Sequence, residues 1–371
     1  MTRLAIDGRE LVAGARTGIG RYVREVVRAA AARGWRCIVY GDTRTASREI
    51  PAGVPLTRLT TPGRRWWDQL ALPRALARDH ADVFLSPYYK APLAAPCPVV
   101  LTIHDLYFIG YEARRPLRDA ALTAAARLYA RRARAIVADS EHTRRAVVAR
   151  LGVDPAKVAV IGVAVGAEFA PTPLSSAARA RYDLGPRYVL YVGNFMPHKN
   201  VDGLLRAWAS LPAALRAAHR LVLAGVDAAR RPPLEALAGA LGVASSVVFP
   251  GRIDDADLPG VYSACTAFVL PSHDEGFGLP AVEAMACGAP VIVSDRGALP
   301  EVAGPGADVV DTHAEGALAA AIARVLLDRE RREALGRRGR ARAADFAPAR
   351  TAARVLDLLE SVAGVPVAVT P

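Results

Sequence analysis

Two glutamates in the segment Glu275-Gly-Phe-Gly-Leu-Pro-Ala-Val-Glu283 are the residues best suited to chemistry in this sequence. Glu283 is the only charged residue in 276–290, and a lone carboxylate in an apolar segment is costly unless a polar group meets it. Gly276 and Gly278 fall where a strand-like run gives way to a helix, so a ligand can approach the backbone there. Because helix N-termini also bind anions, the pattern suits a ligand with hydroxyls at both ends and an anion between, such as a nucleotide sugar.

A purely structural interpretation stays open on these residues alone, with Glu275 capping the helix and Glu283 paired with an arginine. The segment nevertheless resembles the Glu-x7-Glu signature of retaining glycosyltransferases of family 4, which have the GT-B fold, and the similarity extends from Val269 to Glu301. The resemblance implies that Glu283 binds the nucleotide ribose and that Glu275 lies at the transferred sugar. It also implies that backbone amides contact sugar and phosphate at Gly276, Phe277, Gly278 and Leu279.

Lys199 follows the strand-like run Tyr188–Val192 and is one of 3 lysines beside 45 arginines. Because the chain otherwise uses arginine, a lysine retained here indicates a need for a compact ammonium. An ammonium can stabilise negative charge as it develops, such as that on a leaving diphosphate. The family usually has an arginine where this chain has Asn194, so the resemblance leaves one donor-binding cation missing. Arg252 and His198 are the two candidates to replace it.

Two further candidates lie in the first half of the chain. His104 directly follows the run Val99–Ile103, and a histidine there can donate to a sugar hydroxyl or can simply be tied to a carbonyl in the core. The family has a matching histidine that contacts the donor sugar, which favours the functional role. Gly18 and Gly20, in Thr17-Gly-Ile-Gly-Arg21, resemble the family's glycine loop over the donor, although a tight turn without a ligand explains them as well.

No cofactor and no metal ion are expected. Asp254-Asp255-Ala-Asp257 contains the Asp-x-Asp pattern that holds a metal in other glycosyltransferases, but it precedes a helical pattern and is interpreted as an acidic helix start. The four cysteines follow no metal spacing and are expected to be reduced, buried thiols.

The net charge of +12 agrees with several anionic partners. Nucleic acid is not expected, because no zinc-knuckle or aromatic-basic single-strand motif is present. Arg64-Arg65-Trp66-Trp67 combines cations with interfacial aromatics, which indicates either a peripheral membrane contact or an amphipathic helix with its tryptophans packed inward. No run approaches the roughly 20 apolar residues of a membrane span, and the start lacks a signal peptide's apolar core. A cytoplasmic protein is therefore predicted, and association with the inner face of the membrane is part of this prediction.

Strand-like apolar runs alternate with helical patterns throughout, which predicts α/β architecture with two doubly wound, Rossmann-like domains of parallel strands. The GT-B resemblance implies that they face each other across a cleft. The predicted strands are Leu4–Ile6, Cys37–Tyr40, Val83–Leu85, Val99–Ile103, Ile136–Ala138, Val158–Ile161, Tyr188–Val192, Leu221–Ala224, Val247–Phe249, Ala267–Leu270, Val291–Val293 and Val309–Val310. Predicted helices in the first half are Ile19–Ala32, Trp66–Ala77, Arg118–Arg132 and Thr143–Leu151.

The predicted domains are an acceptor-side domain over residues 1–170 and a nucleotide-sugar domain over 171–345. The proline-interrupted segment 168–176 marks the linker between them. Residues 346–371 are predicted to form a C-terminal helix that returns to the first domain, as in GT-B proteins.

The resemblance therefore implies a retaining transferase that moves a hexose, first of all mannose from GDP-mannose, to a saccharide acceptor that is expected to be lipid-linked. Within the family, the sequence most resembles mannosyltransferases of surface-polysaccharide assembly. Three alternatives remain: a UDP-hexose-dependent transferase, a GT-B nucleotide-sugar 2-epimerase, and a non-catalytic nucleotide-sugar-binding protein. The sequence leaves the base, the sugar, the linkage and the oligomeric state open.

Overall fold

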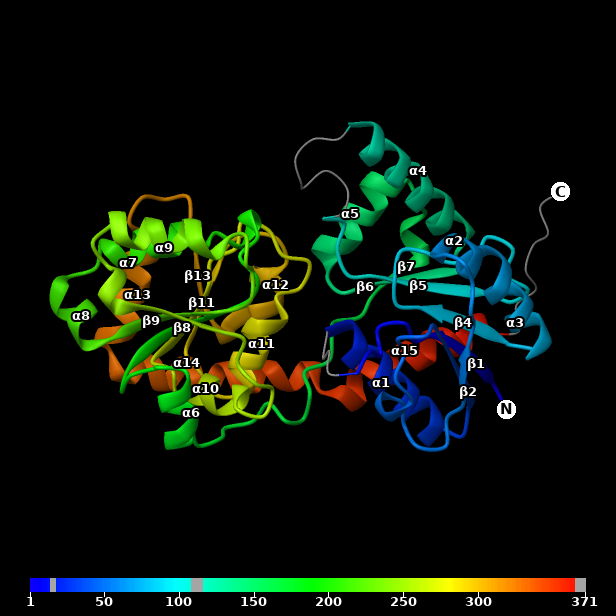
Figure 1. The fold of residues 1–371 in the computed structure, drawn as a ribbon, viewed down its shortest axis with the longest axis horizontal. Helices are drawn as coiled ribbons and strands as arrows, with labels where there is room; N and C mark the ends of the chain where they lie inside the picture. Colours follow the sequence, from blue (N-terminus) through cyan, green and yellow to red (C-terminus); the bar gives the residue numbers. More distant parts are fainter. Residues whose placement is uncertain (14–17, 108–115, 364–371) are drawn as a thin grey trace. The chain divides into compact units, whose positions relative to one another are not determined.

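The computed structural model describes residues 1–13, 18–107 and 116–363, which form two compact units (Figure 1). Unit 1 comprises Met1–Ala164 together with the C-terminal segment from Pro348, and unit 2 comprises Val165–Ala347. The predicted boundaries stood after residues 170 and 345. Unit 2 begins at Val165, before the predicted start at residue 171. The reason is local, because the amide of Val165 donates to the carbonyl of Phe346 in unit 2 at 2.9 Å. Phe169 also packs on Tyr262 of unit 2, with ring centroids 6.0 Å apart.

Unit 1 is built on a seven-stranded parallel sheet in the order β3-β2-β1-β4-β5-β6-β7. Its strands are β1 (Arg3–Asp7), β2 (Arg36–Gly41), β3 (Leu56–Arg58), β4 (Val83–Ser86), β5 (Val99–Ile103), β6 (Ala135–Ala138) and β7 (Val158–Val160). Its helices are α1 (Gly18–Ala32), α2 (Arg64–Trp66), the π-helix η2 (Trp67–Ala71), α3 (Leu72–Arg78), α4 (Pro116–Arg132), α5 (Glu141–Leu151) and α15 (Pro348–Val362).

Unit 2 has a six-stranded parallel sheet in the order β10-β9-β8-β11-β12-β13. Its strands are β8 (Tyr188–Val192), β9 (Arg220–Ala224), β10 (Val247–Gly251), β11 (Ala267–Leu270), β12 (Val291–Ser294) and β13 (Asp308–Val310). Its α-helices are α6 (Ser176–Arg181), α7 (Val201–Ala209), α8 (Ala213–Ala218), α9 (Arg231–Ala240), α10 (Leu258–Ala264), α11 (Leu279–Ala286), α12 (Leu299–Ala303), α13 (Ala317–Leu327) and α14 (Arg329–Ala343). Short 3-10 turns are η1 (Ser47–Glu49), η3 (Pro155–Lys157), η4 (Pro197–Lys199), η5 (Ala244–Ser246), η6 (Gly304–Gly306) and η7 (Ala344–Phe346).

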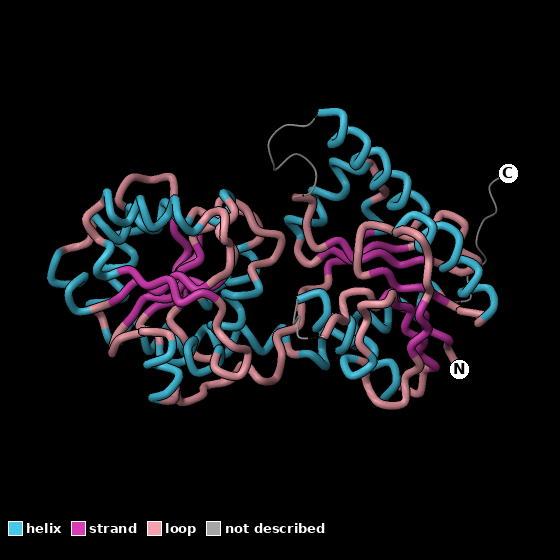
Figure 2. The backbone as a smooth tube through the Cα atoms, in the orientation of Figure 1, coloured by secondary structure: helices cyan, strands magenta, loops and turns pink. Residues whose placement is uncertain are grey.

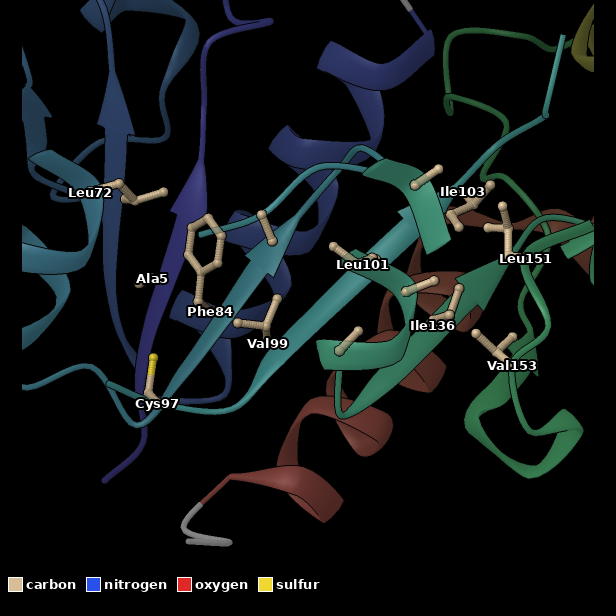
Figure 3. Packing of buried hydrophobic residues seen from close by; sticks show 14 of the residues in the cluster. Ala5, Leu72, Phe84, Cys97, Val99, Leu101, Ile103, Ile136, Leu151 and Val153 are labelled. Carbon is tan, nitrogen blue, oxygen red and sulfur yellow. The ribbon is translucent and has the colours of Figure 1, made fainter. Parts of the chain in front are cut away.

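Each sheet lies between layers of helices, and Figure 2 shows this layering within each unit. Strand side chains alternate between the two faces, so Leu4 and Ile6 of β1 join one apolar cluster while Ala5 joins the other. The cluster of Ala5 contains Phe84, Leu101 and Ile136 (Figure 3). Side chains of α3, α4 and α5 complete it. The opposite cluster is completed by α1 and α15, which pack against each other.

The predicted pair of doubly wound domains is confirmed, and every predicted strand is present. Among the strands of the described residues, the prediction missed β3, which lies at the edge of its sheet and whose sequence Leu56-Thr-Arg58 has no apolar run. The helix predicted over Trp66–Ala77 is interrupted, because a π-helical turn at Trp67–Ala71 separates α2 from α3.

Both sheets follow the doubly wound strand order. The first strands are added one after another toward one edge of the sheet, and the later strands are added from the middle toward the other edge. In unit 1 the reversal lies between β1 and β4, and in unit 2 between β8 and β11. Ligands of such sheets bind outside the carboxyl ends of the strands at this switch point. The loops after β8 and β11 are therefore the first place to look for a site in unit 2.

Candidate active site

Lys199 and Glu275 meet at the switch point of unit 2. Lys199 ends the turn η4 that follows β8, and Glu275 lies in the loop between β11 and α11. The ammonium Nζ of Lys199 donates to Oε1 of Glu275 at 2.7 Å, and the two side chains are only 16% and 7% exposed. The structure thus brings together two residues that were singled out separately in the sequence.

The carboxylate of Glu275 is held by a second donor, since the hydroxyl of Ser272 lies 2.8 Å from the same oxygen. Ser272 is itself fixed, because its carbonyl accepts a hydrogen bond from the hydroxyl of Ser294 at the end of β12. The backbone carbonyl of Glu275 accepts from the amide of Ala298 at 2.9 Å. The glutamate is therefore positioned by neighbouring strands before any ligand binds.

A glycine behind this loop explains how the loop can come so close to its neighbour. Gly297 has φ +61°, and a Cβ there would lie 2.5 Å from the amide nitrogen of Glu275. Only glycine fits both the left-handed conformation and the close approach. Gly297 is thus a positioning residue for Glu275 that sequence reasoning missed.

The amides predicted to contact sugar and phosphate lie at the start of α11. The helix begins at Leu279, and Gly278 precedes it with φ +87°. Phe277 packs edge-on against Phe346, with ring centroids 5.3 Å apart, which fixes the loop through Gly276 and Gly278. The free amides of a helix start stabilise negative charge, and this one begins beside Glu275.

Glu283 lies one turn into α11 and does not share the contacts of Glu275. Its Oε2 accepts a hydrogen bond from the hydroxyl of Tyr262 at 3.1 Å, and the residue is 6% exposed. Burial, and then the charge of Glu283, raises the pKa of Tyr262 well above its ordinary value, so this hydroxyl stays a donor. The arrangement orients one carboxylate oxygen of Glu283.

The structure shows which positively charged residues near the site could replace the arginine that the family has at the position of Asn194. Asn194 is exposed just beyond β8, and its side chain accepts from the amide of Met196 at 3.2 Å. Burial, and then the charge of Lys199, lowers the pKa of His198, so this ring is neutral at pH 7 and is a poor substitute. Arg252 is half exposed and lies 3.5 Å from Asp255. Arg230, which was not predicted, is close enough to His198 to contribute to its lowered pKa.

His104 lies in unit 1 at the end of β5. Its Nδ1 lies 2.7 Å from Oδ2 of Asp139, which follows β6 and is 4% exposed. Burial by itself lowers the pKa of His104, but the charge and hydrogen bond of Asp139, with Asp105 and the carbonyl of Pro87, raise it above the ordinary value overall. The sequence places Asp139 at the end of a strand in the same way as His104, but the pairing of the two was not predicted.

Gly18 and Gly20 lie in the first turn of α1, also in unit 1, while Thr17 lies outside the described residues. Of the acidic stretch before α10, Asp254 and Asp257 contact Arg181 and Tyr182, with the tyrosine hydroxyl donating to Asp257 at 2.9 Å. Within the described residues, no three His, Cys, Asp or Glu side chains are grouped as a metal site would need.

The two adjacent tryptophans differ in burial, so one agrees with inward packing and the other is available for a membrane contact. Trp67 is buried beneath the guanidinium of Arg9, whereas Trp66 is 57% exposed. Among the described helices, none is both long and apolar enough to cross a bilayer.

Comparison with known proteins agrees with this geometry. Residues 16–169 match the family model described as Glycosyltransferase Family 4, and residues 177–342 match the one described as Glycosyl transferases group 1. The chain is 30% identical over 305 residues to O-antigen chain mannosyltransferase B of Escherichia coli, covering 81% of this chain and 77% of the relative. It is 36% identical over 179 residues to the serotype-specific mannosyltransferase WbdA of Escherichia coli, but these span 47% of this chain and only 22% of that protein.

Among solved structures, sucrose-phosphate synthase from Thermosynechococcus elongatus superposes with a TM-score of 0.77 at 25% identity, covering 97% of this chain and 99% of the other. The sheet order, the paired Lys199 and Glu275 at the switch point, and the two family matches lead to one conclusion. The chain belongs to the GT-B glycosyltransferases that combine a family 4 domain with a group 1 domain, and it is a glycosyltransferase.

Proposed function

We propose that this glycosyltransferase acts in polysaccharide assembly, moving mannose from GDP-mannose to a saccharide acceptor with retention of anomeric configuration. The observation that carries the proposal is the buried pair of Lys199 and Glu275 beside the start of α11. The choice of mannose rests on the relatives whose names describe mannosyltransferases. A UDP-hexose is the first alternative donor, and a lipid-linked acceptor is part of the proposal.

The mechanism follows from the charges at the site. Lys199 and the amides at the start of α11 stabilise the diphosphate as the glycosidic bond breaks and negative charge develops on the leaving oxygen. Glu275, already fixed by Ser272, steadies the sugar while positive charge develops at the anomeric carbon. The acceptor hydroxyl attacks that carbon from the face the diphosphate leaves, and a leaving phosphate oxygen takes its proton.

Glu283 is assigned to the ribose, because one of its oxygens is fixed by Tyr262 and a carboxylate can accept from both hydroxyls of a diol. His104, backed by Asp139, is assigned to a donor-sugar hydroxyl. No metal ion is required in this scheme, since Lys199 and the helix dipole supply positive charge. Arg230 and Arg252 are the two candidates for the second cation on the diphosphate.

A peripheral membrane contact at Trp66 is also proposed. Its exposed indole, with Leu70 37% exposed on the next helical turn, would place aromatic and apolar surface at an interface. Such a contact would bring the enzyme to an acceptor carried on lipid.

The donor is tested by thermal shift against GDP-mannose, UDP-hexoses and dTDP-hexoses. A ligand at 100 times its Kd stabilises the folded state by about 2.7 kcal/mol, which is easily measured. Transfer is then followed with the donor that binds, and NMR of the product gives the anomeric configuration. An inverted product, or sugar-nucleotide turnover to an epimer without an acceptor, would require another function.

A further inference from the structure

Unit 1 has a polar pocket at the switch point of its sheet. Its volume is about 200 Å³, and its lining comes from the loops after β1, β2 and β4 and from the π-helix η2: Arg9, Glu10, Arg44, Asp68 and residues 88–90. The direction of unit 1's sheet reverses between β1 and β4, so this pocket occupies the position where doubly wound sheets bind ligands. Nothing in the assignments above uses it.

The floor of the pocket is a built charge network. The guanidinium of Arg9 lies 2.6 Å from Asp7 and 2.8 Å from Asp68, with these three side chains no more than 12% exposed. It also stacks on the ring of Trp67 at 3.8 Å. Asp68 is carried by the π-helical turn that breaks the predicted helix, and such turns frequently occur at functional sites because they re-aim a side chain.

The charges of the pocket are nearly balanced. Arg9 is offset by its two aspartates, and Arg44 lies 2.9 Å from Asp42. Lys90 is close enough to Asp68 to favour the charged form of that carboxylate, and Glu10 accepts a hydrogen bond from the hydroxyl of Tyr88. A phosphate would therefore meet carboxylates as well as cations, whereas the hydroxyls of a neutral sugar can both donate to carboxylates and accept from Arg and Lys.

The aromatic residues fit the same ligand. Tyr88 and Tyr89 are among the lining residues, and the ammonium of Lys90 lies 5.1 Å from the Tyr89 ring centroid. Aromatic faces cover the apolar side of a sugar ring while the polar groups reach its hydroxyls. The volume is below the roughly 300–1,000 Å³ of pockets that enclose a whole drug-sized ligand, so it suits a single monosaccharide unit.

We propose that this pocket is an outer acceptor subsite, which binds a neutral hexose unit of the growing saccharide one or more rings away from the reacting hydroxyl. The inference rests on the proposed function, in which a saccharide is the acceptor and His104 marks the reacting sugar. His104 follows β5, and β1 lies two strands from β5 in the sheet. Strands are spaced by about 4.8 Å, so the pocket centre is on the order of 10 Å along the sheet edge from His104. That separation exceeds one sugar ring.

The kinetic test uses acceptors of increasing length: methyl α-mannoside, mannobiose and mannotriose. In the wild type, kcat/KM for the acceptor should rise with length. Lys90→Ala and Arg44→Ala should lower it for the longer acceptors by about threefold to tenfold, the effect of one or two lost hydrogen bonds, and the loss should grow with acceptor length. The KM for the donor should not follow this trend.

The chain offers matched controls outside the pocket. Lys157→Ala removes another lysine of unit 1, whose ammonium donates to the carbonyl of Arg131 at 3.1 Å. Arg78→Ala removes an arginine with 61% exposure that pairs with Asp79, which closely matches Arg44 with 56% exposure and its partner Asp42. Neither control should change the dependence on acceptor length.

A binding arm separates failure of this inference from failure of the proposed function. Saturation-transfer NMR of mannotriose with the intact protein should show contact in the wild type and in Lys157→Ala, and weaker contact in Lys90→Ala. If no donor supports transfer, the proposed function fails, and this arm still decides the subsite. Equal binding of mannotriose by wild type and Lys90→Ala, absence of binding, or a KM change that is the same for all acceptor lengths would each overturn the inference.

Discussion

Lys199 and Glu275 form a direct ion pair of 2.7 Å, although the two residues are assigned to opposite ends of the bond that breaks. Without a donor, each neutralises the charge of the other. In the proposed reaction, the diphosphate of the donor therefore competes with Glu275 for the ammonium of Lys199. The pair keeps the carboxylate from being a lone charge in the buried site.

Replacement of Lys199 tests its role on the leaving group. Lys199→Ala should lower kcat by roughly 100-fold or more, as loss of a transition-state donor does in other enzymes. Lys199→Arg should restore only part, because a planar fork does not replace a compact ammonium. Steady-state kinetics at saturating donor measures both, and full activity of Lys199→Arg would contradict the argument from residue choice.

The two glutamates should separate kinetically. Glu283→Gln should mainly raise the KM for the donor, because the ribose does not change during the reaction. Glu275→Gln keeps the shape but removes the charge beside the anomeric carbon, so its main loss should be in kcat, with the affinity for free nucleoside diphosphate nearly intact. Titration with the nucleoside diphosphate completes the comparison. The opposite pattern would reverse the two assignments.

Asp139 should govern the titration of His104. In wild type the pKa of His104 should lie above 6.5, and Asp139→Asn should lower it, since the aspartate is the main group that raises it. A raised folded-state pKa stabilises the protein below about pH 6.5, and this stability is lost as pH rises through the folded pKa. The stability difference between wild type and Asp139→Asn should therefore shrink over that window. NMR titration and denaturant unfolding at several pH values measure the two effects, and a pKa unchanged in Asp139→Asn would exclude the coupling.

Gly297 offers a test of how Glu275 is positioned. Gly297→Ala should lower kcat, because its Cβ would displace the backbone of Glu275. Gly242→Ala is the matched control: Gly242 has φ +68° in the same unit, and nothing lies within 4 Å of the position of its Cβ. Both should lose about 1 kcal/mol of stability from the left-handed backbone, and Gly297→Ala should lose more because of the backbone clash. Only Gly297→Ala should lose substantial activity. Equal activity in the two variants would show that the close approach is not needed.

Transfer should survive excess EDTA. The reason is the positive charge that Lys199 and the start of α11 already supply, together with the use of Asp254 and Asp257 by Arg181 and Tyr182. Turnover is measured with and without the chelator, followed by addition of Mg²⁺ or Mn²⁺. Loss with EDTA and recovery with the metal ion would contradict the metal-free scheme.

Much of the fold could be predicted because the strands of a doubly wound sheet are continuous apolar runs, buried on both faces. Edge strand β3 escaped because an edge strand needs no such run, and the π-helix escaped because its period differs little from that of an α-helix over one turn. The position of Lys199 and Glu275 at strand ends was visible, since the carboxyl ends of parallel strands share one edge.

The contacts themselves could not be predicted from local pattern. Lys199 and Glu275 are 76 residues apart, and His104 and Asp139 are 35 apart, so each pair depends on which strands are neighbours. The network of Arg9 and Asp68 depends in addition on a π-turn that aims one side chain. Such pairs become predictable only once the strand order is known.

Helix α15 makes unit 1 discontinuous in sequence, because the chain completes unit 2 before Val355, Leu356 and Leu359 enter unit 1's core. Along the chain, unit 2 lies between the two segments of unit 1. An exchange of unit 2 between relatives therefore has two natural junctions, after Ala164 and before Pro348. A fusion at the first junction alone, or a deletion of the C-terminal residues through α15, would leave the apolar face of α1 uncovered. Recombination that respects both junctions can replace unit 2 while unit 1 keeps its complete core.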